Sequence, residues 1–152
     1  MMVRSQPHHM ALSAHNIFSA WYEWYPAVSY DFNSISFSSG DVVKLTVTAS
    51  STKAGTAVIE NVTTGKTVTK SLKSSSALCQ QDAEWIVEDF EEGSSLVKFA
   101  DFGTVTFKDA TAVSTSGDSS TPAGATIIDI KQSSKVLTSV TASGSEVVVK
   151  YV

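Results

Sequence analysis

The sequence predicts an all-β fold, an antiparallel β-sandwich of two sheets. Apolar and polar residues alternate with a period of two in short runs, as they do in half-buried strands. Clusters of Gly, Ser and Thr interrupt these runs about every ten residues, and no apolar stripe of helical period is sustained. Many short strands joined by frequent turns are typical of sandwiches.

The clearest strand signals lie in the first half of the chain. In 41–50, Val43, Leu45 and Val47 alternate with polar residues, which predicts a half-buried strand. The segment 56–72 predicts two strands joined by a turn at Thr64-Gly65. Further strands are predicted at 97–107, 125–132, 135–143 and 145–152, with a polar loop at 114–124 and a turn at Ser143-Gly144.

A dense aromatic cluster surrounds one carboxylate in the segment 20–32. Its members are Trp21, Tyr22, Glu23, Trp24, Tyr25, Tyr30 and Phe32. Aromatic side chains that line a cleft commonly hold a peptide or a sugar. The same run is also typical of a strand on the sandwich core, with Glu23 at its solvent edge, and the pattern favours this second interpretation.

Acidic residues are concentrated in the segment 84–92, which holds five of the 15 in the chain. As a helix this segment would stack Glu84, Glu88 and Glu92 at a spacing where like charges repel. The surrounding residues are strand formers, so we predict a strand.

The predicted strand gives Glu88 an apolar setting. Alternation places Glu88 between Ile86 and Phe90 on one face, and an apolar setting raises the pKa of a carboxyl group. This prepares Glu88 for acid–base work. Asp89 and Glu91 fall on the opposite face and are predicted to be solvated.

Length and composition fit one globular domain with its own core. The 152 residues are 42% hydrophobic and 17% charged, which is too apolar for a disordered chain. The net charge of −4 comes without a basic stripe, which argues against nucleic acid as a partner. No apolar run approaches the length of a membrane-spanning helix, so we expect no membrane partner. Residues 1–18 show no periodicity, and we predict a leader there and the domain over 19–152.

We expect neither a metal site nor a cofactor. The three histidines, His8, His9 and His15, all lie in the predicted leader, and no cluster elsewhere has the spacing of metal ligands. The chain has no G-x-S-x-G motif for a serine nucleophile and no Gly-rich phosphate loop. Carboxylates and amides remain as the groups that can carry chemistry.

The cysteine and a glycosylation sequon are relevant to whether the chain is exported from the cell. Cys79 is the only cysteine, so it is either a small buried thiol or one half of a bond whose partner is absent here. The sequon Asn61-Val62-Thr63 predicts a glycan if the chain is exported. Residues 1–18 do not have the layout of a signal peptide.

Four motifs in chain order resemble the glutamic peptidases, the eqolisin family of fungal acid endopeptidases. They are AWYEWYP, SSGDVVKLTVTASS, GTAVIENVTTGKTVTKSL, and LCQQDAEWIVEDFEE with SLVKFADFGTVTF. The resemblance implies a jelly-roll, concanavalin A-like sandwich. It also implies catalysis by one glutamate and one glutamine. The glutamate is the general base toward water and then the general acid, while the glutamine amide stabilises the oxyanion.

The resemblance assigns roles to residues of this chain. Glu88 matches the catalytic glutamate, Glu23 a carboxylate near the active site, and Trp21 and Tyr25 residues of the cleft. Phe90, two positions after Glu88, is expected to bind substrate. The resemblance further implies protein or peptide substrates, an acidic optimum, a monomer and secretion.

The start of the chain departs from the family pattern. The family's glutamine belongs to a Q-x-G segment upstream of AWYEWYP, whereas Gln6 has no Gly two residues later and no family strand around it. Gln80 and Gln81 lie in another segment and do not match it. The cysteine that pairs with Cys79 in family members lies in the same upstream portion. We therefore expect the family's N-terminal third to be missing and the sandwich to be incomplete there.

Two other functions stay open on the sequence alone. A non-catalytic module would bind peptide or glycan through the aromatic residues Trp21, Tyr22, Trp24 and Tyr25. A glycosidase would use Glu23 and Glu88 and would require their carboxyl groups about 5–10 Å apart.

Overall fold

The structure is a computed structural model, which describes residues 2–8, 17–89, 91–92, 94–96 and 98–152. The chain divides into two compact units, Met1–Gln81 and Asp82–Val152. Every regular element in the described ranges is a β-strand, and every strand pair is antiparallel. The predicted all-β class is confirmed, while the domain over 19–152 stays a prediction.

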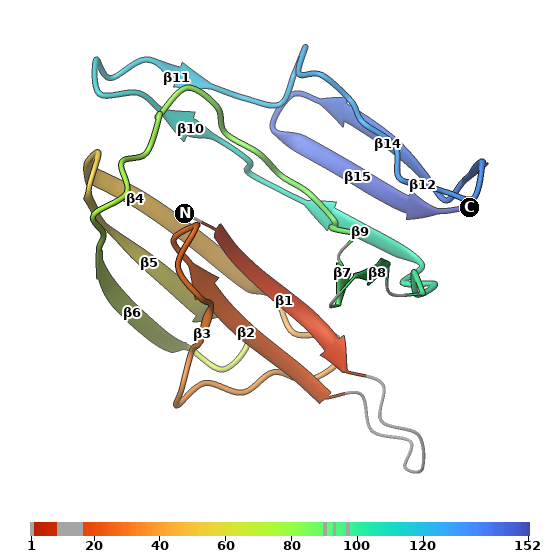
Figure 1. The fold of residues 1–152 in the computed structure, drawn as a ribbon, viewed down its shortest axis with the longest axis horizontal. Helices are drawn as coiled ribbons and strands as arrows, with labels where there is room; N and C mark the ends of the chain where they lie inside the picture. The colour runs from red at the N-terminus through yellow and green to blue at the C-terminus, as the bar shows by residue number, and fades with distance from the viewer. Residues whose placement is uncertain (1, 9–16, 90, 93, 97) are drawn as a thin grey trace. The chain divides into compact units, whose positions relative to one another are not determined.

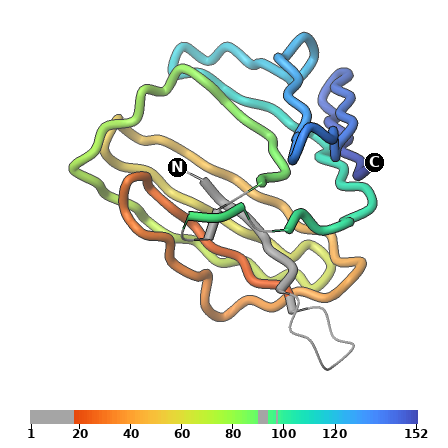
Figure 2. The backbone as a smooth tube through the Cα atoms, turned by 45° about the vertical axis from the view of Figure 1, so that its right-hand side comes forward, coloured from red at the N-terminus to blue at the C-terminus, as the bar shows by residue number. Residues whose placement is uncertain are grey.

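The first unit contains two three-stranded sheets whose strands follow one another in chain order. One sheet consists of β1 (Met2–His8), β2 (Ile17–Glu23) and β3 (Tyr30–Asp31). The other consists of β4 (Val43–Ser51), β5 (Ala54–Asn61) and β6 (Lys66–Lys73). Figure 1 shows the two sheets as layers, and Figure 2 follows the chain through the β4–β5–β6 meander.

The core of the first unit lies where β5 faces β2 and β3. Burial alternates strictly along β5, and Ala57 and Ile59 are fully buried. They form one cluster with Ala20 of β2 and Phe32, the residue after β3. Ile59 pairs with Leu45 of β4 and Val68 of β6, so apolar residues of all three strands share the inward face. The predicted alternation at 56–72 is thus part of the packing surface, with Val68 and Leu72 of β6 half-buried against the core. The strand predicted at 41–50 is present as β4, but Val43, Leu45 and Val47 are 39–47% exposed, so its half-buried character is wrong.

The turn predicted at Thr64-Gly65 is confirmed. It joins β5 to β6, and Asn61 pairs with Lys66 across it. Gly65 has φ of 71°, a left-handed conformation that glycine adopts without a steric penalty.

Asn61, the last residue of β5, links three segments of the first unit. Its side chain is fully buried, and its Nδ2 donates to the carbonyl oxygen of Ser36 at 3.1 Å and to Asp41 Oδ2 at 2.7 Å. Its Oδ1 accepts the backbone N–H of Thr64 at 3.1 Å. The nitrogen that a glycan would occupy is therefore engaged in hydrogen bonds inside the folded unit, and the glycan stays a prediction from the sequon.

Our expectation that the leader contains no strand is wrong for residues 2–8. These residues form β1, which pairs along its whole length with β2, from Met2 opposite Glu23 to His8 opposite Ile17. A ladder is made by backbone groups and does not require side-chain periodicity. The absence of alternation in this segment was therefore no evidence against a strand. Gln6 stands opposite Ser19 in this ladder.

The second unit contains one three-stranded sheet and several short strand pairs among its described residues. The sheet has the order β14 (Thr138–Ser143), β15 (Glu146–Tyr151), β9 (Thr104–Phe107). The pairs are β7 (Glu91–Glu92) with β8 (Ser95–Leu96), β10 (Ala112–Val113) with β11 (Ser119–Ser120), and β12 (Lys131–Gln132) with β13 (Lys135–Val136).

The core of this unit follows the alternation of β15. Val147 and Val149 are buried, and their ladder partners Phe107 and Val105 lie on the same face. At the end of the strand, the ring of Tyr151 contacts those of Phe99 and Phe102 with centroids 6.2 Å apart in each case.

The predicted strands of this half are only partly present. The hairpin 135–152 with its turn at Ser143-Gly144 is confirmed, with β13 and β14 in its first arm and β15 in its second. Among the described residues of 97–107 and 125–132, only Thr104–Phe107 and Lys131–Gln132 are in strands. The polar loop 114–124 includes β11, which pairs with β10. Alternation predicts which side chains are buried, whereas a strand also needs a neighbour whose position the sequence does not give.

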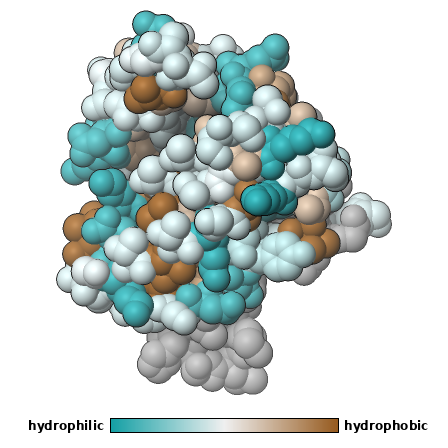
Figure 3. Space-filling model, turned by 90° about the vertical axis from the view of Figure 1, so that its left-hand side faces the viewer, coloured by the Kyte–Doolittle hydropathy of each residue, from teal (hydrophilic) through white to brown (hydrophobic). Residues whose placement is uncertain are grey.

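Apolar residues are scattered on the face of the molecule drawn in Figure 3. Hydrophobic residues form small groups there, separated by polar residues. Scattered apolar side chains of this kind are normal for a protein surface. In the part of the chain that the structure describes, no helix has the length and apolar character to cross a membrane.

We expect Asn61→Ala to lower the free energy of unfolding by about 1–3 kcal/mol, because it leaves buried polar groups without partners. Urea denaturation followed by circular dichroism measures the change. Asn33→Ala, at an exposed position, is the matched control and should change stability by less than about 0.5 kcal/mol. Equal effects of the two changes would contradict the role given to Asn61.

We also expect part of the stability to depend on Asp41 and to be lost in acid. The hydrogen bond from the Ser38 N–H, then that from Asn61, lowers the pKa of Asp41 below its usual 3.8, partial desolvation opposes this, and Thr63 adds to the lowering. Because the folded pKa is below the unfolded one, this contribution is complete above 3.8 and disappears as the pH falls through the folded value. Asp41→Asn should therefore destabilise the protein more at about pH 6 than at about pH 2 in the same urea assay. A difference independent of pH would contradict this linkage.

Candidate functional site

The acidic segment is extended but is mostly not a strand. Residues 82–89 belong to no ladder, and among the described residues of 84–92 only Glu91–Glu92 is a strand, so the predicted strand is largely wrong. Side-chain exposure still alternates at its start, with Trp85 and Val87 half-buried and Ile86 46% exposed. Ile86 therefore does not shield Glu88 as the alternation predicted, and Phe90, its other predicted neighbour, lies outside the described residues.

Glu88 is half-buried within the second unit, and its Oε2 atom is buried. Removing a carboxylate oxygen from water disfavours the ionised form. A carboxyl group in this setting can accept a proton and return it, which is the requirement for a general base and acid. The structure thus places one carboxylate oxygen of Glu88 out of contact with water, and the catalytic role of Glu88 stays a prediction.

Asp89 is bound to a glutamine far away in the sequence. Nε2 of Gln132 donates to both carboxylate oxygens, at 3.0 Å to Oδ1 and 3.2 Å to Oδ2. Both residues are half-buried, so the prediction that Asp89 is solvated is wrong. The alternation of side chains assigns a residue to one face of a β-sheet only if the residue belongs to a strand of that sheet. Residues 82–89 do not belong to a strand. No local signal pointed to Gln132, because its partner is 43 positions away.

Gln132 is held by a tight hairpin. Gln132 pairs with Lys135, which leaves Ser133 and Ser134 as a two-residue loop, with φ of 46° and 70°. Positive φ at both loop positions is the conformation of a type I′ hairpin turn. Next to the hairpin, the hydroxyl of the buried Thr138 accepts the N–H of Ile130 at 2.7 Å.

The predicted binding residues Trp21 and Glu23 lie on the outer face of their sheet. Along β2, Ala20 and Tyr22 belong to the core of the first unit, so Trp21 and Glu23 project to the opposite side. Both are half-buried, and Asp31 of β3 stands opposite Trp21 in the ladder. By register, Trp21, Glu23 and Asp31 therefore lie on the same face of this sheet.

The aromatic cluster divides between core and surface. Trp24 is only 5% exposed, and its Nε1 donates to the carbonyl oxygen of Ser76 at 3.0 Å. Tyr22 packs on the core, with its ring 4.9 Å from that of Phe32. Tyr25, in the turn after β2, is 80% exposed. The core interpretation thus holds for Trp24 and Tyr22, and neither presents an aromatic face for a ligand.

The remaining residues singled out in the sequence are the single cysteine and the histidines considered as metal ligands. Cys79 is exposed, so its interpretation as a small buried thiol is wrong. His9 and His15 lie outside the described residues. Within the described ranges, no group of three or more His, Cys, Asp or Glu side chains is arranged to hold a metal ion.

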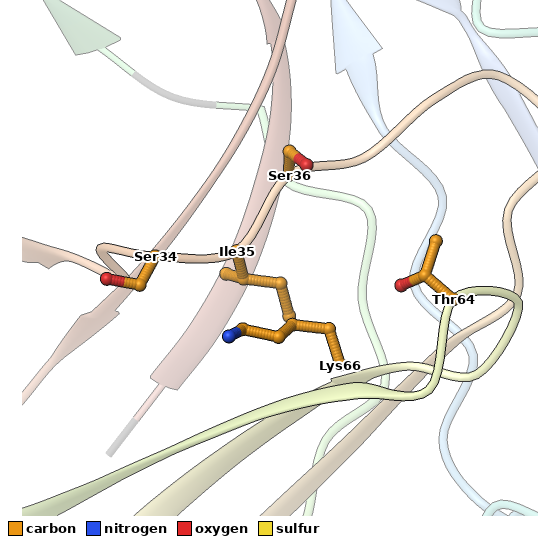
Figure 4. Close-up of a pocket in the computed structure, with 5 residues that line it drawn as sticks. All are labelled: Ser34, Ile35, Ser36, Thr64 and Lys66. Atoms are coloured by element: carbon orange, nitrogen blue, oxygen red, sulfur yellow. The ribbon is translucent and has the colours of Figure 1, made fainter.

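A hollow of about 570 Å³ opens on the first unit, beside the Asn61 hydrogen bonds. Figure 4 shows the side chains around it, of which one is aliphatic, one carries an amine and three carry hydroxyl groups. Its lining residues are Ser34, Ile35, Ser36, Thr64 and Lys66. The lining contains no carboxylate and none of the predicted site residues.

Comparison with known proteins decides the family. The model described as the Peptidase A4 family matches residues 9–151, a span that begins inside the predicted leader. The chain belongs to the peptidase A4 family. This agrees with the resemblance to glutamic peptidases carried by the four motifs.

Two curated relatives share this membership. The chain is 51% identical over 137 residues to aspergillopepsin-2 of Aspergillus niger, with 89% of this chain and 48% of the relative covered. It is 42% identical over 144 residues to scytalidopepsin B of Scytalidium lignicola, with 89% and 55% covered. The chain thus spans about half the length of the curated relatives it matches.

Solved structures of peptidase A4 relatives have a similar fold. The crystal structure of aspergilloglutamic peptidase from Aspergillus niger matches with a TM-score of 0.87 and 47% identity, covering 99% of this chain and 86% of that chain. Scytalido-glutamic peptidase with a transition state analog inhibitor matches with a TM-score of 0.83 and 41% identity, covering 90% and 70%.

We expect Trp24→Ala to destabilise the protein by about 3–5 kcal/mol, because it empties a buried site and removes the bond to Ser76. Tyr25→Ala, one residue later at an exposed position, should cost less than about 0.5 kcal/mol. Urea denaturation followed by far-ultraviolet circular dichroism compares the two variants. Similar losses for both would show that Trp24 is not the core residue described above.

Proposed function

We propose that the protein is an acid endopeptidase in which Glu88 is the general base. The observation that carries this proposal is membership of the peptidase A4 family, whose relatives here are named peptidases. The burial of Glu88 Oε2 supports the role given to that residue. Because the chain covers about half of its curated relatives, activity, substrates and localisation are all part of the proposal.

In the proposed reaction, Glu88 takes a proton from water while the water oxygen attacks the carbonyl carbon of the scissile peptide bond. The tetrahedral intermediate carries its negative charge on the former carbonyl oxygen. Protonated Glu88 then gives its proton to the leaving nitrogen as the C–N bond breaks, which returns Glu88 to its starting form. An acidic medium favours protonation of the leaving amine and of other carboxyl groups near the site.

The oxyanion requires a hydrogen-bond donor, and the resemblance implies a glutamine amide for this role. Gln6 is the glutamine that precedes β2, yet His8 stands where the family motif has Gly. We therefore assign no residue of this chain to the oxyanion. A donor of this kind typically contributes about 10²–10³-fold to kcat.

Trp21, Glu23, Tyr25 and Phe90 are proposed to bind the substrate, which we expect to be an unfolded protein or a peptide. A structure of scytalido-glutamic peptidase contains a peptide-based transition state analog, and one of SCP-B contains the tripeptide Ala-Ile-His. These complexes support a peptide as the ligand of this family. Secretion and a monomeric state are proposed on the same resemblance.

The two other functions receive less support. The non-catalytic module was expected to bind its ligand through four aromatic residues. Two of them, Trp24 and Tyr22, pack in or against the core and are not offered to a ligand. The glycosidase has no counterpart among the relatives described above, which are peptidases. No specific observation favours either alternative.

We expect Glu88→Gln to lower the rate of peptide-bond hydrolysis by about 10²–10⁴-fold at acid pH, because the amide cannot accept the proton of water. Cleavage of a quenched-fluorescent peptide library, followed by mass spectrometry of the products, measures the rate and verifies cleavage within the chain. The variant keeps the size of the side chain, so circular dichroism should be unchanged.

Glu84→Gln is the matched control, because it makes the same change at an exposed carboxyl group of the same segment. We expect it to keep the wild-type rate within about twofold. Hydrolysis that survives Glu88→Gln unchanged would overturn the role of Glu88. Binding of peptides without hydrolysis by the wild type would favour the non-catalytic module.

A further inference from the structure

The segment that carries Glu88 is not fixed by a β-ladder. Residues 82–89 have no strand partner, in contrast to the paired strands β9, β14 and β15 of the same unit. A general base must nevertheless be held to within a fraction of an ångström to act on one water molecule. Side-chain interactions must therefore contribute to placing this segment.

The bond between Asp89 and Gln132 is suited to this purpose. It connects the residue directly after Glu88 to β12, with the Gln132 amide nitrogen within 3.2 Å of both carboxylate oxygens. Both side chains are half-buried, which strengthens a hydrogen bond to a carboxylate compared with one in open water.

The hairpin that supplies Gln132 is a firm support. Its loop has only two residues, Ser133 and Ser134, so Gln132 lies in the pair that closes the turn. Directly after it come Leu137 and Thr138, both buried. The side-chain amide is therefore presented from a hairpin whose end is anchored in the unit.

We propose that Gln132 is a positioning residue for catalysis, which acts through Asp89 to hold Glu88 in its productive place. This inference rests on the proposed function. Gln132 itself transfers no proton in the scheme above. Since adjacent Cα atoms are separated by about 3.8 Å, a shift of Asp89 is passed to Glu88 with little loss. A displacement of about 1 Å in a reacting group can cost about 10²-fold in rate.

The test exchanges the two groups of the pair. Gln132→Glu replaces the amide by a carboxyl group, and at about pH 6, where carboxyl groups of ordinary pKa are ionised, it sets one carboxylate against another. All variants are therefore compared at this pH. Asp89→Asn keeps an oxygen that accepts from Gln132, so its effect should be within about threefold. The double variant Asp89→Asn with Gln132→Glu restores one amide donor and one carboxyl acceptor with the original side-chain lengths.

We expect Gln132→Glu to lower kcat by about 10–100-fold with KM changed less than about twofold, because ground-state binding does not depend on the pair. The double variant should recover kcat to within about threefold of Asp89→Asn. Gln81→Glu, which adds the same charge at an exposed glutamine, should behave as wild type. A double variant as slow as Gln132→Glu, or a single variant as fast as wild type, would overturn the proposal.

Hydrogen exchange measured by mass spectrometry provides a readout that does not depend on activity. In Gln132→Glu we expect peptides covering 82–92 to exchange about tenfold faster than in wild type, with recovery in the double variant. If the wild-type chain hydrolyses nothing, the proposed function fails and the exchange result alone decides whether Gln132 holds this segment. Unchanged exchange in that segment would overturn the positioning role in either case.

Discussion

The inward row of β5 is the constraint on which the first unit depends. Ala57 and Ile59 meet Ala20 and Phe32 across the two sheets, and Asn61 ends the same row with hydrogen bonds to two connections. Because side chains alternate along a strand, a slip of one residue would turn the whole row to solvent. One register therefore fixes both the apolar contact between the sheets and the polar contacts that hold the adjoining loops.

The second unit places its candidate catalytic group by different means. Its sheet is secured by the buried Val147 and Val149, whereas Glu88 lies in a segment with no ladder. Segments with few backbone bonds open at lower free-energy cost than sheet strands, which suits a group that must meet an incoming chain. Without a ladder, the position of Glu88 must be maintained by interactions between side chains. The hydrogen bond from Gln132 to Asp89 is one such interaction.

The sequence predicted what is local and failed where distant partners decide. The hairpins at Thr64-Gly65 and Ser143-Gly144 were predictable because turn chemistry and alternation lie within one short segment. The strand at 84–92 was mostly wrong, and the one at Met2–His8 was missed, because a ladder depends on a neighbour that periodicity does not reveal. Glu88 came from a family motif, whereas its link to Gln132 had no sequence signal at all.

The hydrogen bonds of the Asn61 side chain differ in how they depend on pH. Asp41 is a carboxylate acceptor for Ser38 and Asn61, and it weakens in this role once it is protonated. The remaining bonds of Asn61, to the Ser36 carbonyl and from the Thr64 N–H, join neutral groups whose strength does not change with pH. The Asn61 side chain thus keeps both connections in place after the Asp41 contribution has gone. The buried row therefore ends in hydrogen bonds of which two do not depend on the ionisation of Asp41.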